Sequence, residues 1–218
     1  MLVDDEEIGM SRFLAFGAAA VTAAFLGGSA GYLYWKQGDT ASDPLADCRE
    51  GQVGGASIGG PFTLLDKAGQ AVTDKEIITR PTLVYFGYTF CPDVCPFDMS
   101  RNVEAIKLLE EKGEDVGLVF VTIDPERDTP EVVGDYAANL DEGVIGLSGS
   151  KEQIKAAADA YRVYYKAQPS DDGYYLVDHT AFTYLMLPGI GFADFYKREA
   201  SPEQIANGAA CMIDASAG

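Results

Sequence analysis

The sequence is poor in histidine and in positive charge, and each shortage limits what the protein can do. It has a single histidine, His179, so neither a zinc centre with three histidines nor a haem with two histidine ligands can be built. Only 16 Lys and Arg stand against 34 Asp and Glu, which gives a formal charge of −18. That charge repels a phosphate backbone, and no cluster of Lys and Arg opposes it locally. Nucleic acid is therefore excluded as a partner.

The rest of the composition is that of a folded protein. Hydrophobic residues make up 47% of the 218 positions, and 12 Tyr and 11 Phe are among them. This is too much apolar material for a solvated coil, despite the charge. A chain of this length forms one domain with appendages or two small domains, and it can bury a core without relying on disulfides.

Charge is absent from residues 13–35, which lie between Arg12 and Lys36. A helix over this segment would be roughly 34 Å long, enough to cross a hydrocarbon core of about 30 Å. Aromatic residues at its far end suit the membrane interface, so we expect an uncleaved transmembrane helix. A cleaved signal peptide is the alternative, but the apolar run continues beyond the only plausible cleavage site, at residues 28–30. A buried soluble helix is disfavoured because the segment has no polar face.

This helix divides the chain into a short tail at residues 1–12, the helix at 13–35, a tether at 36–60 and a domain at 61–218. The charges that flank the helix do not fix its orientation. The acidic residues of the tail argue against a mitochondrial presequence, which would be basic. The glycine-rich tether lacks the Gly-Lys-Ser/Thr of a phosphate-binding loop, and no apolar strand precedes it.

Strand and helix signals alternate along the domain. The patterns predict strands at residues 61–65, 81–88, 117–123, 144–147, 174–177, 180–187 and 192–196. They predict helices at residues 98–111 and 151–161, and others that begin near 129 and 201. We therefore expect an α/β fold with a mixed central sheet and helices on both faces.

Two of the four cysteines, Cys91 and Cys95, follow the strand predicted at 81–88. Placed on the first turn of the next helix, residues four apart share one face, and the helix N-terminus favours their thiolates. Their spacing is one residue longer than that of the usual thioredoxin-like dithiol, which lets an ion bridge the two sulfurs. Thiolates select soft ions, and two of them with one imidazole suit Cu(I). Two structural cysteines, or a disulfide between them, are the alternative.

His179 is the only imidazole that could complete such a site. It lies at the edge of a predicted strand, where alternation places Asp178 and His179 on opposite faces. A lone histidine is more often a satisfied polar residue than a metal ligand, so the residues by themselves leave both readings open.

The remaining cysteines, Cys48 and Cys211, are candidates for a structural disulfide that joins the tether to the last helix. By loop entropy such a bond would contribute roughly 5 kcal/mol. It persists only in an oxidising compartment, and would place everything after residue 35 outside the cytoplasm. Two free thiols are the alternative.

Three motifs in this order resemble the SCO/SenC family of copper-delivery proteins. They are residues 87–96 (GYTFCPDVCP), 121–130 (VTIDPERDTP) and 178–180 (DHT), and the resemblance covers about residues 59–213. An N-terminal membrane anchor is also usual in that family. The Cys48 and Cys211 pair does not belong to the common family pattern.

The resemblance implies a thioredoxin-like fold and a copper site formed by Cys91, Cys95 and His179. It implies that Asp93 supports this site without binding the metal. The cofactor would be copper, as Cu(I) and in some states as Cu(II). The partners would be a copper donor protein, the lipid bilayer and the cytochrome c oxidase subunit that carries the copper A centre.

These expectations lead to a membrane-anchored copper chaperone, which is not an enzyme. A thiol:disulfide oxidoreductase that reduces the copper A cysteines is the alternative, because it uses the same dithiol but does not need His179. A resident oxidase subunit is a third reading, since small residues in the predicted membrane helix would let another helix approach closely. We expect a bacterial inner-membrane protein with a periplasmic domain, and the mitochondrial inner membrane is the other placement.

Overall fold

A computed structural model describes residues 27–29, 31–32, 45–49, 58–169 and 174–217 of the chain. The chain divides into two compact units, Met1–Ala46 and Asp47–Gly218. The predicted tail, nearly all of the predicted membrane helix and most of the tether lie outside the described residues. Within those that are described, no helix is both long enough and apolar enough to cross a bilayer.

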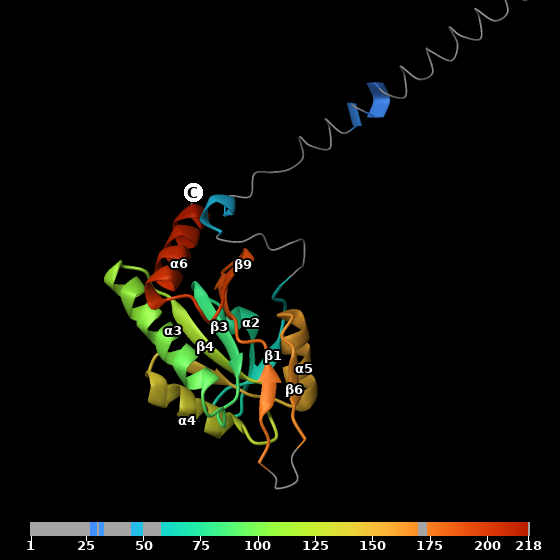
Figure 1. Cartoon of the computed structure of the whole chain (residues 1–218), viewed down its shortest axis with the longest axis vertical. Coiled ribbons are helices and arrows are strands. Elements are labelled where there is room, and N and C mark those ends of the chain that lie inside the picture. The colour runs from blue at the N-terminus through green and yellow to red at the C-terminus, as the bar shows by residue number, and fades with distance from the viewer. Residues whose placement is uncertain (1–26, 30, 33–44, 50–57, 170–173, 218) are drawn as a thin grey trace, which may run out of the picture. The chain divides into compact units, whose positions relative to one another are not determined.

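The second unit is built on a five-stranded sheet (Figure 1). The strands run in the order β5-β4-β3-β8-β9 and comprise Val144–Leu147, Gly117–Thr122, Thr82–Gly87, Thr183–Leu187 and Gly191–Tyr196. The first three are parallel. β8 runs antiparallel to β3, and β9 runs antiparallel to β8. The predicted mixed sheet is confirmed.

The central strands are buried on both faces, as their unbroken apolar sequences predict. Every residue of β3 and of β4 is buried. Parallel strands need crossover connections, and helices supply them here. The crossovers are α3 (Val94–Glu111), from β3 to β4, and α4 (Pro130–Leu140), from β4 to β5. Two more helices, α5 (Lys151–Ala160) and α6 (Pro202–Ser216), cover the sheet without joining parallel strands.

Figure 1 shows α3, α4 and α6 on one side of the sheet and α5 on the other, next to β1 (Thr63–Leu65). Three of these helices begin at a side-chain cap, where the hydroxyl of Thr129, Ser150 or Ser201 accepts a backbone N–H of the first turn. The starts predicted near residues 129, 151 and 201 are therefore correct. In contrast, α3 begins four residues earlier than the predicted start at Asp98.

Two small hairpins complete the unit. β1 pairs with β2 (Ala71–Thr73), which runs into the one-turn helix α2 (Asp74–Ile77). β6 (Tyr165–Ala167) pairs with β7 (Val177–His179) in a two-stranded sheet of its own.

The second hairpin corrects one prediction. Residues 174–177 and 180–187 were expected to form adjoining strands, but the first of these segments, shifted to β7, pairs with β6 instead of β8. β6 has only three residues, and their side chains are half-buried or exposed. Such a strand has no apolar run by which the sequence could predict it. The consequence for the site is that His179, the last residue of β7, does not belong to the central sheet.

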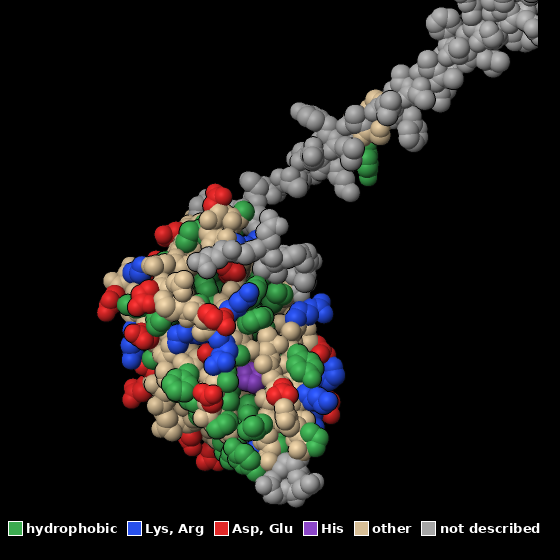
Figure 2. Space-filling view, in the orientation of Figure 1, with side chains coloured by type: hydrophobic (Ala, Val, Ile, Leu, Met, Phe, Trp, Pro, Cys, Tyr) green, Lys and Arg blue, Asp and Glu red, His purple; other side chains and the backbone are tan. Residues whose placement is uncertain are grey.

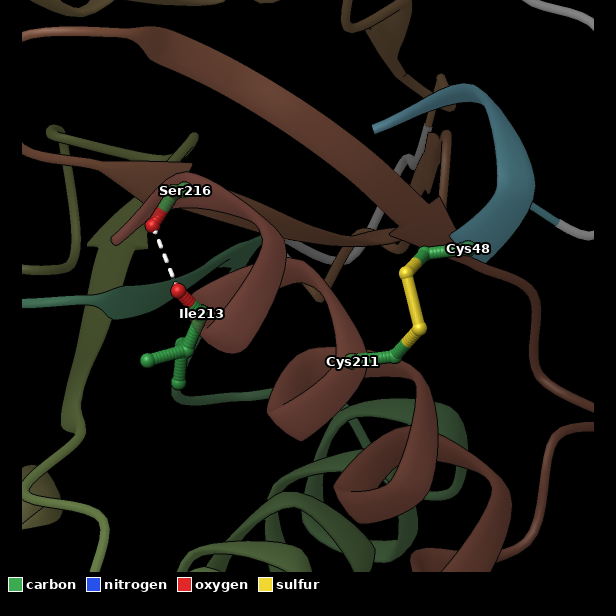
Figure 3. The surroundings of a disulfide bond; sticks show 4 residues. All are labelled: Cys48, Cys211, Ile213 and Ser216. Carbon is green, nitrogen blue, oxygen red and sulfur yellow. Dashed lines mark hydrogen bonds between the residues drawn. A yellow bond between two sulfur atoms is a disulfide. The ribbon is translucent and has the colours of Figure 1, made fainter. Parts of the chain in front are cut away.

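Cys48 and Cys211 form a disulfide, with their Cα atoms 5.7 Å apart (Figure 3). Cys48 ends the short 3-10 helix Ala46–Cys48, and Cys211 lies in α6. The bond joins residues 163 positions apart. It fastens the segment that enters the second unit to the last helix of that unit.

Candidate metal centre

The two remaining cysteines lie at the C-terminal end of β3, where the chain turns into α3. Cys95 is the second residue of α3 and is fully buried. Cys91 lies before the helix, which corrects the prediction that both cysteines occupy its first turn. Pro92 disfavours the helical conformation at Cys91, whereas Pro96 occupies the first turn of α3, where its missing N–H costs no intrahelical bond.

The sulfur of Cys91 nevertheless faces the helix. It accepts the backbone N–H of Cys95 at 3.3 Å, so it satisfies one of the N–H groups that a helix start leaves without an internal partner. The two thiols therefore converge from a loop and from a helix. Gly87 makes room for Cys95 and for two aromatic rings, since a Cβ at that position would lie 3.0 Å from the Cys95 sulfur and 2.9 Å from the rings of Phe120 and Tyr85.

His179 reaches the cysteines from the β6–β7 hairpin. Its Nε2 lies 3.5 Å from the sulfur of Cys95. The two sulfurs and one ring nitrogen all lie within 4.8 Å of one another. Two donor atoms bound to one ion at the usual metal–sulfur distance are at most about 4.6 Å apart, so the three atoms are close to the spacing that one ion requires.

The histidine ring is oriented for ligation. Its Nδ1 lies 3.1 Å from the carbonyl oxygen of Thr180. A carbonyl only accepts, so in the neutral ring Nδ1 carries the proton and Nε2 keeps its lone pair for the sulfur side. The rings of Tyr85 and Tyr88 meet the imidazole edge-on, at centroid distances of 6.3 and 6.0 Å.

The surroundings shift the pKa values of the two thiols in opposite directions. Hydrogen bonding from the Cys95 thiol, and further bonds from backbone N–H groups, lower the pKa of Cys91 far below its ordinary value despite partial burial. The pKa of Cys95 is raised, first because its thiol donates to Cys91 and then because it is buried. Cys91 is thus the thiolate of the pair, and Cys95 keeps its proton until a cation replaces it.

A hollow of about 460 Å³ opens over these residues and includes Cys91, His179 and Asp93 in its lining. Figure 2 shows the histidine at the molecular surface with hydrophobic side chains beside it. Two sulfurs and one imidazole nitrogen form a soft donor set, which fits Cu(I) better than a hard cation. The residues present therefore fit copper.

Comparisons with known proteins agree with this geometry. The family model described as SCO1/SenC matches residues 50–214. The chain belongs to the SCO1/SenC family. Protein SenC of Rhodobacter capsulatus is 51% identical over 176 residues, which are 80% of this chain and 79% of that protein. The mitochondrial SCO1 homolog 1 of Arabidopsis thaliana is 43% identical over 157 residues, which are 72% of this chain and only 47% of that protein.

Solved structures of family members superpose on the second unit. Arabidopsis thaliana ScoI with copper bound has a TM-score of 0.69 at 41% identity, covering 72% of this chain and 98% of that one. Bradyrhizobium japonicum ScoI with copper bound has a TM-score of 0.63 at 41% identity, covering 70% and 98%. The thioredoxin-like fold, with its central mixed sheet flanked by helices, is confirmed.

Asp93 lines the hollow beside Cys91 and His179. Its side chain is exposed and makes no capping hydrogen bond to α3, although Asp93 precedes the first helical residue. Its backbone N–H helps to lower the pKa of Cys91. A supporting role for the Asp93 carboxylate remains a prediction.

A buried polar network under the site was not found by sequence reasoning. The hydroxyl of Tyr85 donates to the carboxylate of Asp98 at 2.9 Å, and Asp98 lies 3.5 Å from Arg101 and 3.7 Å from Arg198. Burial raises the pKa of Asp98, and the two arginines oppose that shift. The one available signal was Asp98 itself, an acidic residue on the apolar face of a predicted helix.

Proposed function

We propose that this chain is a copper chaperone that holds copper between Cys91, Cys95 and His179 and delivers it to the copper A centre of cytochrome c oxidase during assembly. The observation that carries this proposal is the convergence of two sulfurs and one imidazole nitrogen within 4.8 Å, with Cys91 and His179 lining an open hollow. Copper-bound structures of two relatives at 41% identity support the choice of metal.

The site has the properties that a carrier needs. Cys91 is half-buried and already a thiolate, so it can make the first contact with an incoming ion. Cys95 is fully buried and releases a proton as it binds, which makes copper affinity rise with pH. His179 comes from a separate hairpin, so this ligand can give way to one from the acceptor without disturbing the two sulfurs.

Metal content and thiol titration of the anaerobically purified chain test this proposal. The wild-type chain should retain one Cu(I), and loading should protect Cys91 and Cys95 from alkylation. His179→Ala should bind copper more weakly and transfer less of it to an oxidase subunit that lacks copper. If wild-type chain prepared in this way retains no Cu(I), the proposal is wrong.

A second function is favoured by the different environments of the two thiols. An accessible thiolate beside a buried thiol is the arrangement of a thiol:disulfide reductase. Cys91 would attack a disulfide of the copper A site and form a mixed disulfide, and one target sulfur would leave as a thiolate. Cys95 would lose its proton and attack Cys91, so that the target is released as a dithiol and the pair becomes a disulfide.

Replacement of the histidine separates the two functions. The reductase uses only the two sulfurs, so His179→Ala should leave the rate of disulfide reduction nearly unchanged. The chaperone needs the imidazole, and the same variant should lose copper transfer. Oxidase assembly that is normal with His179→Ala and absent with Cys91→Ser would favour the reductase.

We further propose that residues 13–35 anchor the chain in a bacterial inner membrane and that the second unit lies in the periplasm. The apolar sequence of that segment supports the anchor. The disulfide between Cys48 and Cys211 supports an oxidising compartment. Alkylation of an engineered cysteine near residue 60 by a membrane-impermeant reagent in intact spheroplasts tests the sidedness, and protection of that residue would contradict it.

A further inference from the structure

The hairpin that supplies His179 is a separate two-stranded sheet. β6 and β7 pair only with each other and not with the five-stranded sheet. The distance from His179 to the cysteines therefore depends on the groups that join this hairpin to the loops after β3 and β4. One such group is the Tyr88 hydroxyl, which accepts the Val177 N–H at 3.3 Å, and others belong to one short segment, residues 124–128.

Arg127 is the centre of this junction. Its guanidinium lies 3.7 Å from the ring centroid of Tyr175, which precedes β7, and 5.0 and 5.7 Å from those of Phe90 and Tyr88 in the loop that leads to Cys91. One guanidinium nitrogen also donates to the carbonyl oxygen of Tyr175 at 2.9 Å. Arg127 thus contacts both the segment that carries His179 and the loop that carries the cysteines.

Two aspartates fix the segment that carries Arg127. Asp124 accepts its Nε at 2.5 Å and the hydroxyl of Tyr175 at 2.7 Å, so the same carboxylate binds the arginine and the hairpin. Asp128 is fully buried and accepts the backbone N–H of Thr89, two residues before Cys91, at 2.9 Å. The segment is therefore bonded to the cysteine loop on one side and to the histidine hairpin on the other.

The contacts of Arg127 depend on the planar shape of its guanidinium as well as on its charge. The Arg127 and Asp124 side chains are only 16% and 5% exposed, so their ion pair is largely withdrawn from water. A lysine could replace the charge, but it has no planar group to lie on Tyr175 while donating to Asp124 and to a carbonyl. The aromatic rings of two separate segments share a single cation.

We propose that Arg127 is the positioning residue that holds the His179 hairpin against the cysteine loop and so sets the third ligand of the copper site. This inference rests on the proposed copper function for its consequence, but the contact itself can be tested without metal. Without the guanidinium, the hairpin keeps its internal pairing and the hydrogen bond from the Val177 N–H to the Tyr88 hydroxyl. It loses the cation that Tyr175 shares with Phe90 and Tyr88, and His179 is then no longer held in place near Cys95.

The metal-free test uses the fact that the chain has one histidine, so its ring signals in NMR spectra are unambiguous. The wild-type apo chain should show nuclear Overhauser contacts between the His179 ring and the rings of Tyr85 and Tyr88. Arg127→Ala should lose these contacts while the core contacts of the sheet remain. If the His179 contacts persist unchanged in Arg127→Ala, the proposal is wrong.

The copper test is a double-mutant cycle read by competition with a chromophoric Cu(I) chelator. Arg127→Ala should weaken Cu(I) binding about tenfold, the lower end of the effect expected from residues that orient a ligand. In a His179→Ala background the same change should alter affinity less than twofold, because no imidazole is left to position. Equal losses in both backgrounds would overturn the proposal.

Arg80→Ala is the matched control, since Arg80 pairs with Asp115 at the opposite end of β3 and should leave affinity unchanged. Tyr175→Ala removes the ring on which Arg127 lies and leaves Arg127 in place. It serves as a second variant in case Arg127→Ala does not fold. It should also lose the His179 ring contacts and weaken Cu(I) binding. A His179→Ala chain that binds Cu(I) as tightly as wild type would contradict the proposed ligand set, and the NMR contacts would then still decide the role of Arg127.

Discussion

The disulfide between Cys48 and Cys211 should contribute a large share of the stability of the second unit. The bond closes a loop whose ends are 163 residues apart. In the chain-entropy relation, a loop of that length removes about 17 cal/mol/K from the unfolded ensemble, which is about 5 kcal/mol at 25 °C. For a chain of this size, each kcal/mol shifts the melting temperature by about 2–4 °C, so removing the bond should lower Tm by about 10–20 °C.

The assay is thermal and urea unfolding of the oxidised chain in mild detergent, comparing wild type with a variant in which Cys48 and Cys211 are both serine. A reductant should lower the Tm of wild type by a similar amount and leave the double variant unchanged. Replacing Cys91 and Cys95 by serine is the matched control, because neither forms a disulfide and the reductant effect should persist.

The size of the change tests the reasoning. If the double serine variant melts within about 2 °C of wild type, loop closure does not stabilise this unit. If the reductant lowers Tm equally in both chains, the relevant thiols are not Cys48 and Cys211. Either result would refute the argument from loop length.

Three further predictions concern the site and its support. Because the pKa of Cys91 is lowered, Cys91 in the apo chain should react quickly with iodoacetamide at about pH 6, where an ordinary thiol is mostly protonated. Cys95, whose pKa is raised, should not react. Mass spectrometry of the labelled peptides measures this order, and faster labelling of Cys95 would contradict the prediction. Asp128→Ala leaves buried donors without an acceptor and should lower the free energy of unfolding in urea by about 3 kcal/mol or more. The control, Asp135→Ala, breaks an exposed ion pair and should lower it by less than about 1 kcal/mol. Similar losses in the two variants would contradict this account. Gly87→Ala should displace the Cys95 sulfur together with the rings of Phe120 and Tyr85 and so weaken Cu(I) binding in the chelator assay. Wild-type affinity would show that the site accommodates the extra methyl.

The parts of the fold that follow from local chemistry were predictable from the sequence. β5 begins and ends at the predicted residues, and β3 and β4 lie within one residue of their predicted bounds, because buried strands require unbroken apolar runs. Helix starts were predictable where a serine or threonine caps the first turn. The start of α3 was not, since Asp93 precedes it without a side-chain cap.

Contacts between distant segments account for what the sequence did not reveal. The composition of the β6 strand gives no sign that it pairs with β7, and only that pairing takes His179 out of the central sheet. The family resemblance pointed to the motif around Arg127, but the residue it stacks on, Tyr175, lies 48 positions further along the chain. The ligands could be predicted as residue types, whereas the support that holds them together depends on tertiary structure.

The sulfur of Cys91 also has a consequence for the choice of variants. This atom accepts the N–H of Cys95 at the start of α3, so it stabilises the first turn of the helix as well as being a proposed metal ligand. Alanine would remove both at once, and a loss of copper binding would be indistinguishable from fraying of the helix. Serine keeps a side-chain oxygen that can accept the Cys95 N–H. Cys91→Ser is therefore the substitution that separates the chemistry of the thiolate from the architecture of the helix.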